Sequence, residues 1–201
     1  MVTAQLVESI EDVDITNTAL RSIGVIGARS LSCEYEDKVG DIVEDLLGRG
    51  FHIASGGAVG ADEFAISRLV HIGMADRCTV YTPWAGYKRF PIKVRALTRQ
   101  FKEYGGSILW GSIRDQQDYN IVRSALLHRN CRLLDASHGI VAFLHGESRG
   151  SLYTVTKAIS QKMPIVIFPI DRDLPKIANV RWKPLQCGGC WDGGYRAVYL
   201  K

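Results

Sequence analysis

Residues 51–62, FHIASGGAVGAD, are the stretch that decides the fold. Its first part, residues 51–54, is a short apolar run that predicts a buried strand. Asp62 precedes apolar residues at helical spacing, which predicts a helix ending near Gly73. Three glycines separate the two elements, and glycine lets a backbone adopt positive φ and approach a ligand closely. The N–H groups and the dipole at the helix start attract anions.

This stretch therefore predicts a loop that holds a phosphate-bearing ligand. The alternative is a tight turn with Asp62 as the helix cap, although a cap does not require three glycines. The residues expected at the ligand are Ser55, Gly56, Gly57, Gly60 and Asp62.

The segments on either side repeat the same pattern. Before it, the apolar run at residues 22–27, SIGVIG, predicts a strand, and apolar residues between 39 and 47 predict a helix. After it, residues 78–81 predict a third strand. This alternation is typical of a parallel sheet with right-handed crossovers. The first strand ends in Gly27, Ala28, Arg29 and Ser30, at the position where open α/β sheets bind ligands. Arg29 is suited to phosphate oxygens, and the alternative is a solvated surface arginine.

A third loop follows a later strand. Residues 138–144, HGIVAFL, predict a buried strand, the helix after them covers about residues 152–162, and residues 164–168 predict another strand. Small residues and hydroxyls fill the loop between strand and helix, and Ser151 as a plain helix cap is the alternative. The candidate ligand residues here are Gly146, Ser148, Arg149, Gly150, Ser151 and Thr154. Because the carboxyl ends of parallel strands share one edge, the three loops are expected to converge.

The middle of the chain contains a basic segment, residues 88–102, without an acidic residue. A helix is expected at about residues 92–104, a short strand at 107–111, a helix at 116–128 and a separate turn at 129–136. Arg95, Arg99 and Lys102 fall on one helical face, and Trp84 nearby is suited to stacking on a base. These side chains are the nucleic-acid candidates, and a solvated basic face is the alternative.

Composition restricts the remaining classes. The chain has 201 residues, enough for one domain with a sizeable core, and a net charge of +4, which does not by itself demand nucleic acid. It has no apolar stretch of membrane-spanning length and no secretion signal, so a cytoplasmic protein without a membrane partner is expected. The five cysteines are an odd number and three of them, Cys33, Cys78 and Cys131, are scattered, which agrees with reduced thiols. Cys187 and Cys190 have the spacing of half a zinc site, but the other half is missing, so no metal is expected.

Three segments together carry a family resemblance: IGVIGARS, IASGGAVGADEFA and RNCRLLDASHGIVAFLHGESRGSLYTVTKAISQKMPIVIFP. They resemble the SLOG superfamily of Rossmann-like nucleotide-ligand binders, and most closely the Rossmann domain of the DNA-processing protein A (Smf) family. That family's Gly-Ser/Ala-Arg loop corresponds to Gly27-Ala28-Arg29, and its Ser-Gly-x-Ala-x-Gly-x-Asp loop to residues 55–62. Its Arg-Asn pair corresponds to Arg129-Asn130, while its last loop departs to Ser148-Arg149-Gly150-Ser151.

The resemblance implies an α/β, Rossmann-like, mostly parallel sheet with helices on both faces, and it covers a Rossmann domain at residues 22–170. Residues 1–21 are expected to form an amino-terminal arm. From residue 171 onward the sequence has no helical period, and its glycine pairs predict a short β-hairpin-like tail, so a carboxyl-terminal extension at 171–201 packed on the domain is expected. The implied partners are a nucleotide-type molecule, single-stranded DNA and further copies of the chain, with no other cofactor required.

A related branch of the superfamily, the LOG (lysine decarboxylase-like) phosphoribohydrolases, supplies the alternative function. That branch carries Pro-Gly-Gly-x-Gly-Thr followed by a catalytic glutamate, whereas Tyr153 and Thr154 stand at the position of that acid here. Cleavage of a nucleoside phosphate's N-glycosidic bond would need a carboxylate from Asp62, Glu63 or Glu147. We therefore expect binding rather than catalysis and assign no catalytic residue.

Overall fold

The computed structural model describes residues 21–114 and 118–200. The expected amino-terminal arm lies outside these residues except for its last position. The strands are β1 (Ser22–Gly27), β2 (His52–Ser55), β3 (Cys78–Tyr81), β4 (Ser107–Leu109), β5 (Gly139–His145), β6 (Ile165–Ile170), β7 (Val180–Pro184) and β8 (Tyr195–Tyr199). The α-helices are α2 (Glu36–Gly48), α3 (Ala61–His71), α4 (Ile92–Glu103), α5 (Tyr119–Asp135) and α6 (Arg149–Ser160). Short 3₁₀ helices are η1 (Cys33–Tyr35), η2 (Ala75–Arg77), η3 (Tyr87–Arg89) and η4 (Gly189–Trp191).

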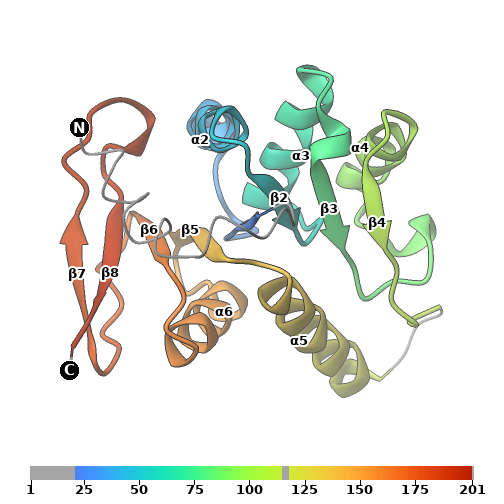
Figure 1. Cartoon of the computed structure of the whole chain (residues 1–201). Helices are drawn as coiled ribbons and strands as arrows, with labels where there is room; N and C mark the ends of the chain where they lie inside the picture. The colour runs from blue at the N-terminus through green and yellow to red at the C-terminus, as the bar shows by residue number, and fades with distance from the viewer. Residues whose placement is uncertain (1–20, 115–117, 201) are drawn as a thin grey trace.

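The described strands form one sheet in the order β4-β3-β2-β1-β5-β6-β8-β7. Neighbours from β4 to β6 are parallel, whereas β8 pairs antiparallel with β6 and β7 antiparallel with β8. Helices α2, α3 and α4 cover one face, and α5 and α6 cover the other (Figure 1). The predicted Rossmann-like α/β fold with a carboxyl-terminal hairpin is therefore confirmed.

The chain changes direction across the sheet between β1 and β5. From β1 it moves outward through β2 and β3 to β4, and α5 then returns it to the other side of β1. Both halves leave their loops at the carboxyl edge of the sheet next to this point. Such a reversal is where open α/β sheets bind ligands. We call the carboxyl edge between β1 and β5 the switch point.

Gly27, the last residue of β1, allows α3 to begin close to the sheet. A Cβ there would lie 2.6 Å from the Cβ of Ala61 and 2.6 Å from the carbonyl oxygen of Phe143. Ala61 is the first residue of α3 and is fully buried. Since interiors are close-packed, no other side chain fits at this position without displacing the helix. Gly27 therefore fixes the position of the second loop next to the first.

Two helix predictions are wrong at their boundaries. Residues 116–128 and 129–136 were expected as a helix and a separate turn, but Tyr119–Asp135 form one continuous helix. The segment contains no proline or glycine, and Leu133 and Leu134 continue its buried face. Helix α6 begins at Arg149, three residues before the expected start. No helix among the described residues has the length and apolar character needed to span a membrane.

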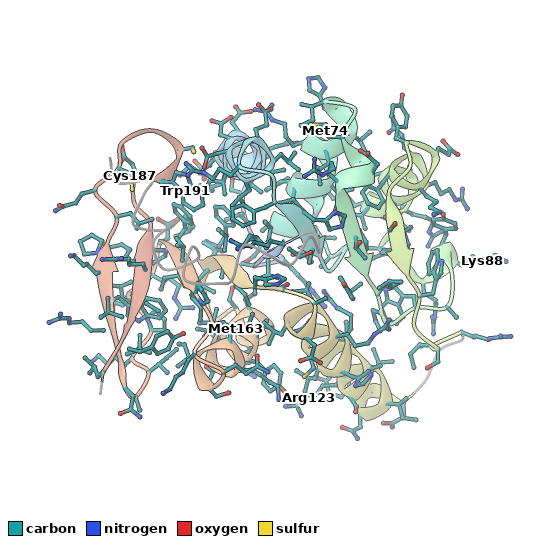
Figure 2. The ribbon with its side chains drawn as sticks, viewed as in Figure 1. Met74, Lys88, Arg123, Met163, Cys187 and Trp191 are labelled. Atoms are coloured by element: carbon teal, nitrogen blue, oxygen red, sulfur yellow. The ribbon has the colours of Figure 1, made fainter. Side chains whose placement is uncertain are left out.

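The carboxyl-terminal hairpin is attached to the rest of the sheet at both ends. Residues 185–194, which connect its strands, reach α2, where the Trp191 indole donates a hydrogen bond of 2.8 Å to Asp45. Figure 2 shows Trp191 between the hairpin and α2, with Cys187 beside it. At the other end, the Tyr199 hydroxyl donates a hydrogen bond to the carbonyl of Met163.

Tyr199 is expected to make the stability of the protein sensitive to alkaline pH. Burial raises its pKa to about 12, above the value of about 10 in an unfolded chain. Between these values the unfolded chain has lost the proton and the folded chain keeps it, so stability falls as the pH rises. Tyr199→Phe should cost about 1 kcal/mol at pH 8, because it removes the hydrogen bond, and this difference should shrink above about pH 10. Urea unfolding of both proteins at pH 8 and 11 measures it, and an equal difference at both values would contradict the assignment.

Candidate functional site

The first and third loops are joined across the switch point. The Ser30 hydroxyl and Nδ1 of His145 form a hydrogen bond of 2.9 Å, which links the ends of β1 and β5. Arg29 is exposed beside this pair. Arg172, which follows β6, donates a hydrogen bond of 2.8 Å to the carbonyl of Gly146. The fold thus brings together two predicted residues, Arg29 and Ser30, and two that sequence reasoning missed.

His145 had one sequence signal, its position directly after the predicted apolar strand at residues 138–144. It was not included among the candidate ligand residues of the third loop. Arg172 had none, because it lies between the predicted strand at residues 164–168 and the hairpin-like tail, in a segment without a helical period. Both residues are placed by β5 and β6, whose parallel pairing ends at His145 and Ile170.

Ser148 leaves the start of α6 without a side-chain cap. Its backbone is in the left-handed region, with φ of 37°. Its hydroxyl donates a hydrogen bond of 2.6 Å back to the carbonyl of His145, and no cap hydrogen bond to α6 is formed within the described residues. A non-glycine residue in this conformation is strained, and such strain concentrates at functional sites. The first N–H groups of α6 are consequently available to an anion. Ser151 lies inside the helix, so the alternative that it caps α6 is wrong.

We call the group formed by Arg29, Ser30, His145 and the first turn of α6 the switch-point site. It combines a guanidinium, a hydroxyl, an imidazole and free backbone donors, drawn from the first and third loops. Groups of these kinds bind phosphate oxygens in proteins.

The second loop uses its amides differently. Ala58 donates a backbone hydrogen bond of 3.2 Å to Asp62, and Gly60 donates one of 3.2 Å to Glu63. Two carboxylates of α3 therefore already occupy amides that were expected to hold the ligand, and they also neutralise the positive end of the helix dipole. The start of α6 is the better anion site of the two.

Two glycines of this loop also have packing reasons. A Cβ on Gly57 would lie 2.9 Å from side-chain atoms of Phe90 and Val80, and one on Gly60 would lie 2.2 Å from the carbonyl oxygen of Ala28. Both residues have positive φ. Gly60 thus lets the first and second loops touch. A ligand contact at Gly57 or Gly60 stays a prediction.

Arg129 is buried directly beneath the second loop. Its guanidinium Nη1 lies 3.8 Å from Asp62 Oδ2, and a Cβ on Gly56 would fall 1.4 Å from that same nitrogen. Burial raises the pKa of Asp62 and lowers the pKa of Arg129, and the opposite charge of each residue counters the shift of the other. Gly56 therefore provides the space in which a buried ion pair forms.

Two buried polar atoms near this pair have no hydrogen-bond partner within the described residues, Nε of Arg129 and the hydroxyl of Ser55. Unsatisfied groups of this kind are uncommon in protein interiors and call for an explanation such as an ordered water or an ion. The neighbouring Asn130 donates a hydrogen bond of 2.9 Å to Thr154 of α6. The Arg129-Asn130 pair thus connects α5 to both the second loop and α6. A ligand contact at Arg129 or Asn130 stays a prediction.

Two of the three basic candidate side chains, Arg95 and Arg99, already contact neighbouring residues of the protein. Arg95 donates hydrogen bonds to the carbonyls of Lys88, at 2.7 Å, and Phe90, at 3.2 Å. The guanidinium of Arg99 lies 5.6 Å from the centre of the Tyr87 ring. Lys102 is exposed. Trp84 follows β3 at the carboxyl edge and packs partly against the core. Nucleic-acid contacts of these residues stay predictions.

We expect the purified protein to contain less than one zinc ion per chain. Among residues 21–114 and 118–200, no group of three or more potential ligands is close enough to hold a metal. Burial also raises the pKa of Cys187 and of Cys190, which disfavours the thiolate form that binds zinc. Elemental analysis that finds one tightly bound zinc per chain would overturn this expectation.

Comparison with known proteins agrees with the fold. The sequence model of the family described as DNA recombination-mediator protein A matches residues 12–180. DNA processing protein A from Streptococcus pneumoniae has a similar structure, with a TM-score of 0.60 and 21% identity over 76% of this chain and 51% of that one. The Helicobacter pylori protein of the same name, described in its single-stranded DNA binding mode, gives a TM-score of 0.60 and 20% identity over 75% and 66%.

The chain spans about half to two thirds of the length of these two proteins. No curated protein sequence matches it at a significant level. At this identity the solved structures show the common fold, whereas the family match covers most of the sequence. The chain therefore belongs to the DNA recombination-mediator protein A family.

Proposed function

We propose that the protein binds single-stranded DNA, with one phosphate of the strand at the switch-point site. The observation that carries the proposal is the uncapped start of α6, which Ser148 leaves open by bonding to His145. Family membership and the single-stranded DNA binding mode of the Helicobacter pylori protein support the same ligand class. In this proposal a mononucleotide, which carries the same kind of phosphate as a DNA strand, is a second and smaller ligand of the same site.

In this proposal each group of the switch-point site has a defined role. The first N–H groups of α6 donate to one phosphate oxygen, and the guanidinium of Arg29 pairs with another. The Ser30–His145 hydrogen bond holds the two loops at the spacing that this requires. Trp84, which follows β3 on the same edge of the sheet, stacks on a base.

The observations do not favour cleavage of an N-glycosidic bond. Asp62 is buried beside Arg129, and Glu63 accepts from Gly60 and lies 3.3 Å from Lys93. Glu147 is exposed and pairs with Arg149 at 2.9 Å. All three carboxylates thus have protein partners, so we propose binding without an assigned reaction. Formation of homo-oligomers and a cytoplasmic location stay predictions.

Fluorescence anisotropy with a labelled oligodeoxythymidylate, titrated with salt, tests the proposal. Binding should weaken with salt, because each neutralised phosphate releases counterions and adds about 0.7 to the magnitude of the log–log slope. A nucleoside monophosphate should compete for the same site. If the wild-type protein binds neither the oligonucleotide nor the monophosphate at low salt, the proposal is wrong.

Trp84→Ala should weaken oligonucleotide binding by about 1 kcal/mol, near the low end for loss of a stacking side chain, because part of the indole is already buried against the core. The salt slope should not change, since stacking involves no counterions. The same anisotropy titration measures both quantities. A changed slope with unchanged affinity would show that Trp84 acts on the charged groups and not on a base.

A further inference from the structure

The hairpin at the end of the sheet has one apolar face and one basic face. Trp182, Tyr195 and Tyr199 pack into the core on the side of α6. On the opposite face, the antiparallel register places Lys183 directly across from Arg196 and Arg181 across from Val198. We call Arg181, Lys183 and Arg196 the basic hairpin face.

The charges of this face are not neutralised by the rest of the described chain. Arg181 and Lys183 are exposed, and none of the three side chains forms an ion pair or a side-chain hydrogen bond with residues 21–114 or 118–200. Like charges directly across a strand pair repel each other. The hairpin carries this repulsion between Lys183 and Arg196.

The contacts with α2 do not cover the three cations. α2 reaches this part of the chain at the connecting residues, through Asp45 with Trp191 and through Lys38, whose ammonium donates to the carbonyl of Asp192 at 2.7 Å. Figure 2 shows Trp191 and Cys187 at this connection, and Lys88 of the basic segment at the opposite end of the sheet. The basic hairpin face is therefore a surface separate from the basic segment.

We propose that the basic hairpin face binds the phosphodiester backbone of single-stranded DNA, as a second contact for a strand held at the switch-point site. This inference rests on the proposed function. Residues two apart on one strand lie about 7 Å from each other, and directly opposed residues lie about 5 Å apart. Three cations at these spacings on an open ribbon match the regular, closely spaced charges of a nucleic-acid backbone. Recognition of this kind depends on phosphates and not on sequence.

The position of the face sets the length of strand that can use it. Arg196 pairs with Val166, near the start of β6, whereas the switch point lies at the far end of β5 and β1. Four residues along a strand and the width of two to three strands separate the two places, so the distance is on the order of 15–20 Å. A mononucleotide bound at the switch point does not reach the face, and a long strand does.

The experiment compares two ligands and two sets of variants. The hairpin variant replaces all three cations by glutamine: Arg181→Gln, Lys183→Gln and Arg196→Gln. For an oligodeoxythymidylate of about 30 nucleotides, the log–log salt slope of binding should become smaller in magnitude by about 2. The affinity at low salt should fall about tenfold or more. Its affinity for a nucleoside monophosphate should not change. The control variant, Lys176→Gln with Lys157→Gln, removes charges from the loop before β7 and from α6, and it should keep the wild-type slope.

The stability of the hairpin variant provides an independent check on folding. Because the substitution removes like-charge repulsion between Lys183 and Arg196, the urea midpoint should stay equal or rise. If the urea midpoint of the hairpin variant falls and its tryptophans become more exposed, the single variant Arg181→Gln is used in its place. Arg181 lies opposite uncharged Val198. That variant alone should reduce the slope by about 0.7.

The outcomes separate this inference from the proposed function. If the wild-type protein binds no nucleic acid and no monophosphate, the proposed function fails and the inference fails with it. If both ligands bind and the hairpin variant keeps the full slope, only the inference is overturned.

The amino-terminal stretch, residues 1–20, has four acidic and no basic side chains, and it is the competing occupant of the face. The test replaces Glu8 and Glu11 with glutamine and Asp12 and Asp14 with asparagine, both in the wild-type protein and in the hairpin variant. If the hairpin substitutions then reduce the slope only in the amide background, the acidic stretch occupies the face and the proposal is overturned.

Discussion

Replacing Gly60 with alanine is expected to destabilise the protein by about 3–4 kcal/mol, since two separate costs combine. Gly60 has φ of 86° and ψ of −130°, which a residue with a Cβ adopts only under strain. In addition, the new Cβ would lie 2.2 Å from the carbonyl oxygen of Ala28 and 3.1 Å from the Cα of Arg29. These are backbone atoms, so the first loop must move as a whole. Urea unfolding followed by tryptophan fluorescence measures the loss.

Gly50 offers a control with a positive φ and open surroundings. Its φ is 85°, and a Cβ there would meet nothing within 4 Å. Gly50→Ala should therefore show only the conformational cost, about 1–2 kcal/mol. If both variants lose the same stability, the close approach of the two loops contributes nothing, and the packing explanation of Gly60 is wrong.

Arg29→Glu is expected to reduce oligonucleotide affinity by about 10- to 100-fold at low salt. A hydrogen bond to a charged group contributes about 1.5–3 kcal/mol, and the new carboxylate repels the phosphate that the guanidinium held. Arg29 is exposed, so the folded structure should not change. Anisotropy at several salt concentrations should also show a shallower slope, because one phosphate contact is lost.

The control for Arg29→Glu is a variant with the same change of charge far from the switch-point site. Lys157→Glu lies on the last turn of α6, at the opposite end of the helix from the switch-point site. It alters the net charge equally and should reduce affinity by much less than Arg29→Glu. Equal losses in the two variants would mean that the protein attracts DNA through its total charge and not through Arg29.

The order of strands and helices could be read from the sequence because each element has its own local pattern. The apolar runs that predicted β1, β2, β3, β5 and β6 are buried on both faces in the sheet, as parallel strands are. The continuation of α5 through Arg129 was missed because an arginine and an asparagine in succession resemble a surface turn. The buried pair with Asp62, which lies 67 positions earlier in the numbering, makes that position part of the core. No local pattern contains a contact of that separation.

For the site, sequence could identify which loops meet but not what their atoms do. Gly56, Gly57 and Gly60 were recognised as positions without a Cβ, yet the neighbours that demand this are Arg129, Phe90 and Ala28. Ser148 turns away from the start of α6 because its backbone φ is positive, and the residue type alone does not predict that angle. His145 reaches the switch point through the pairing of β5 with β1, and Arg172 through the pairing of β6 with β5.

The central place of β1 in the sheet also has a consequence for how the protein folds during synthesis. One neighbour, β2, follows β1 closely in the chain, but the other, β5, begins far later. The hydrogen bond between Ser22 of β1 and His138, the residue before β5, spans 116 positions. Closing so long a loop is entropically costly, which slows the search for the native state. Until the ribosome has released β5, one side of β1 is an unpaired apolar edge that attracts other strands. The strand that is innermost in the finished protein is thus the most vulnerable part of the nascent one.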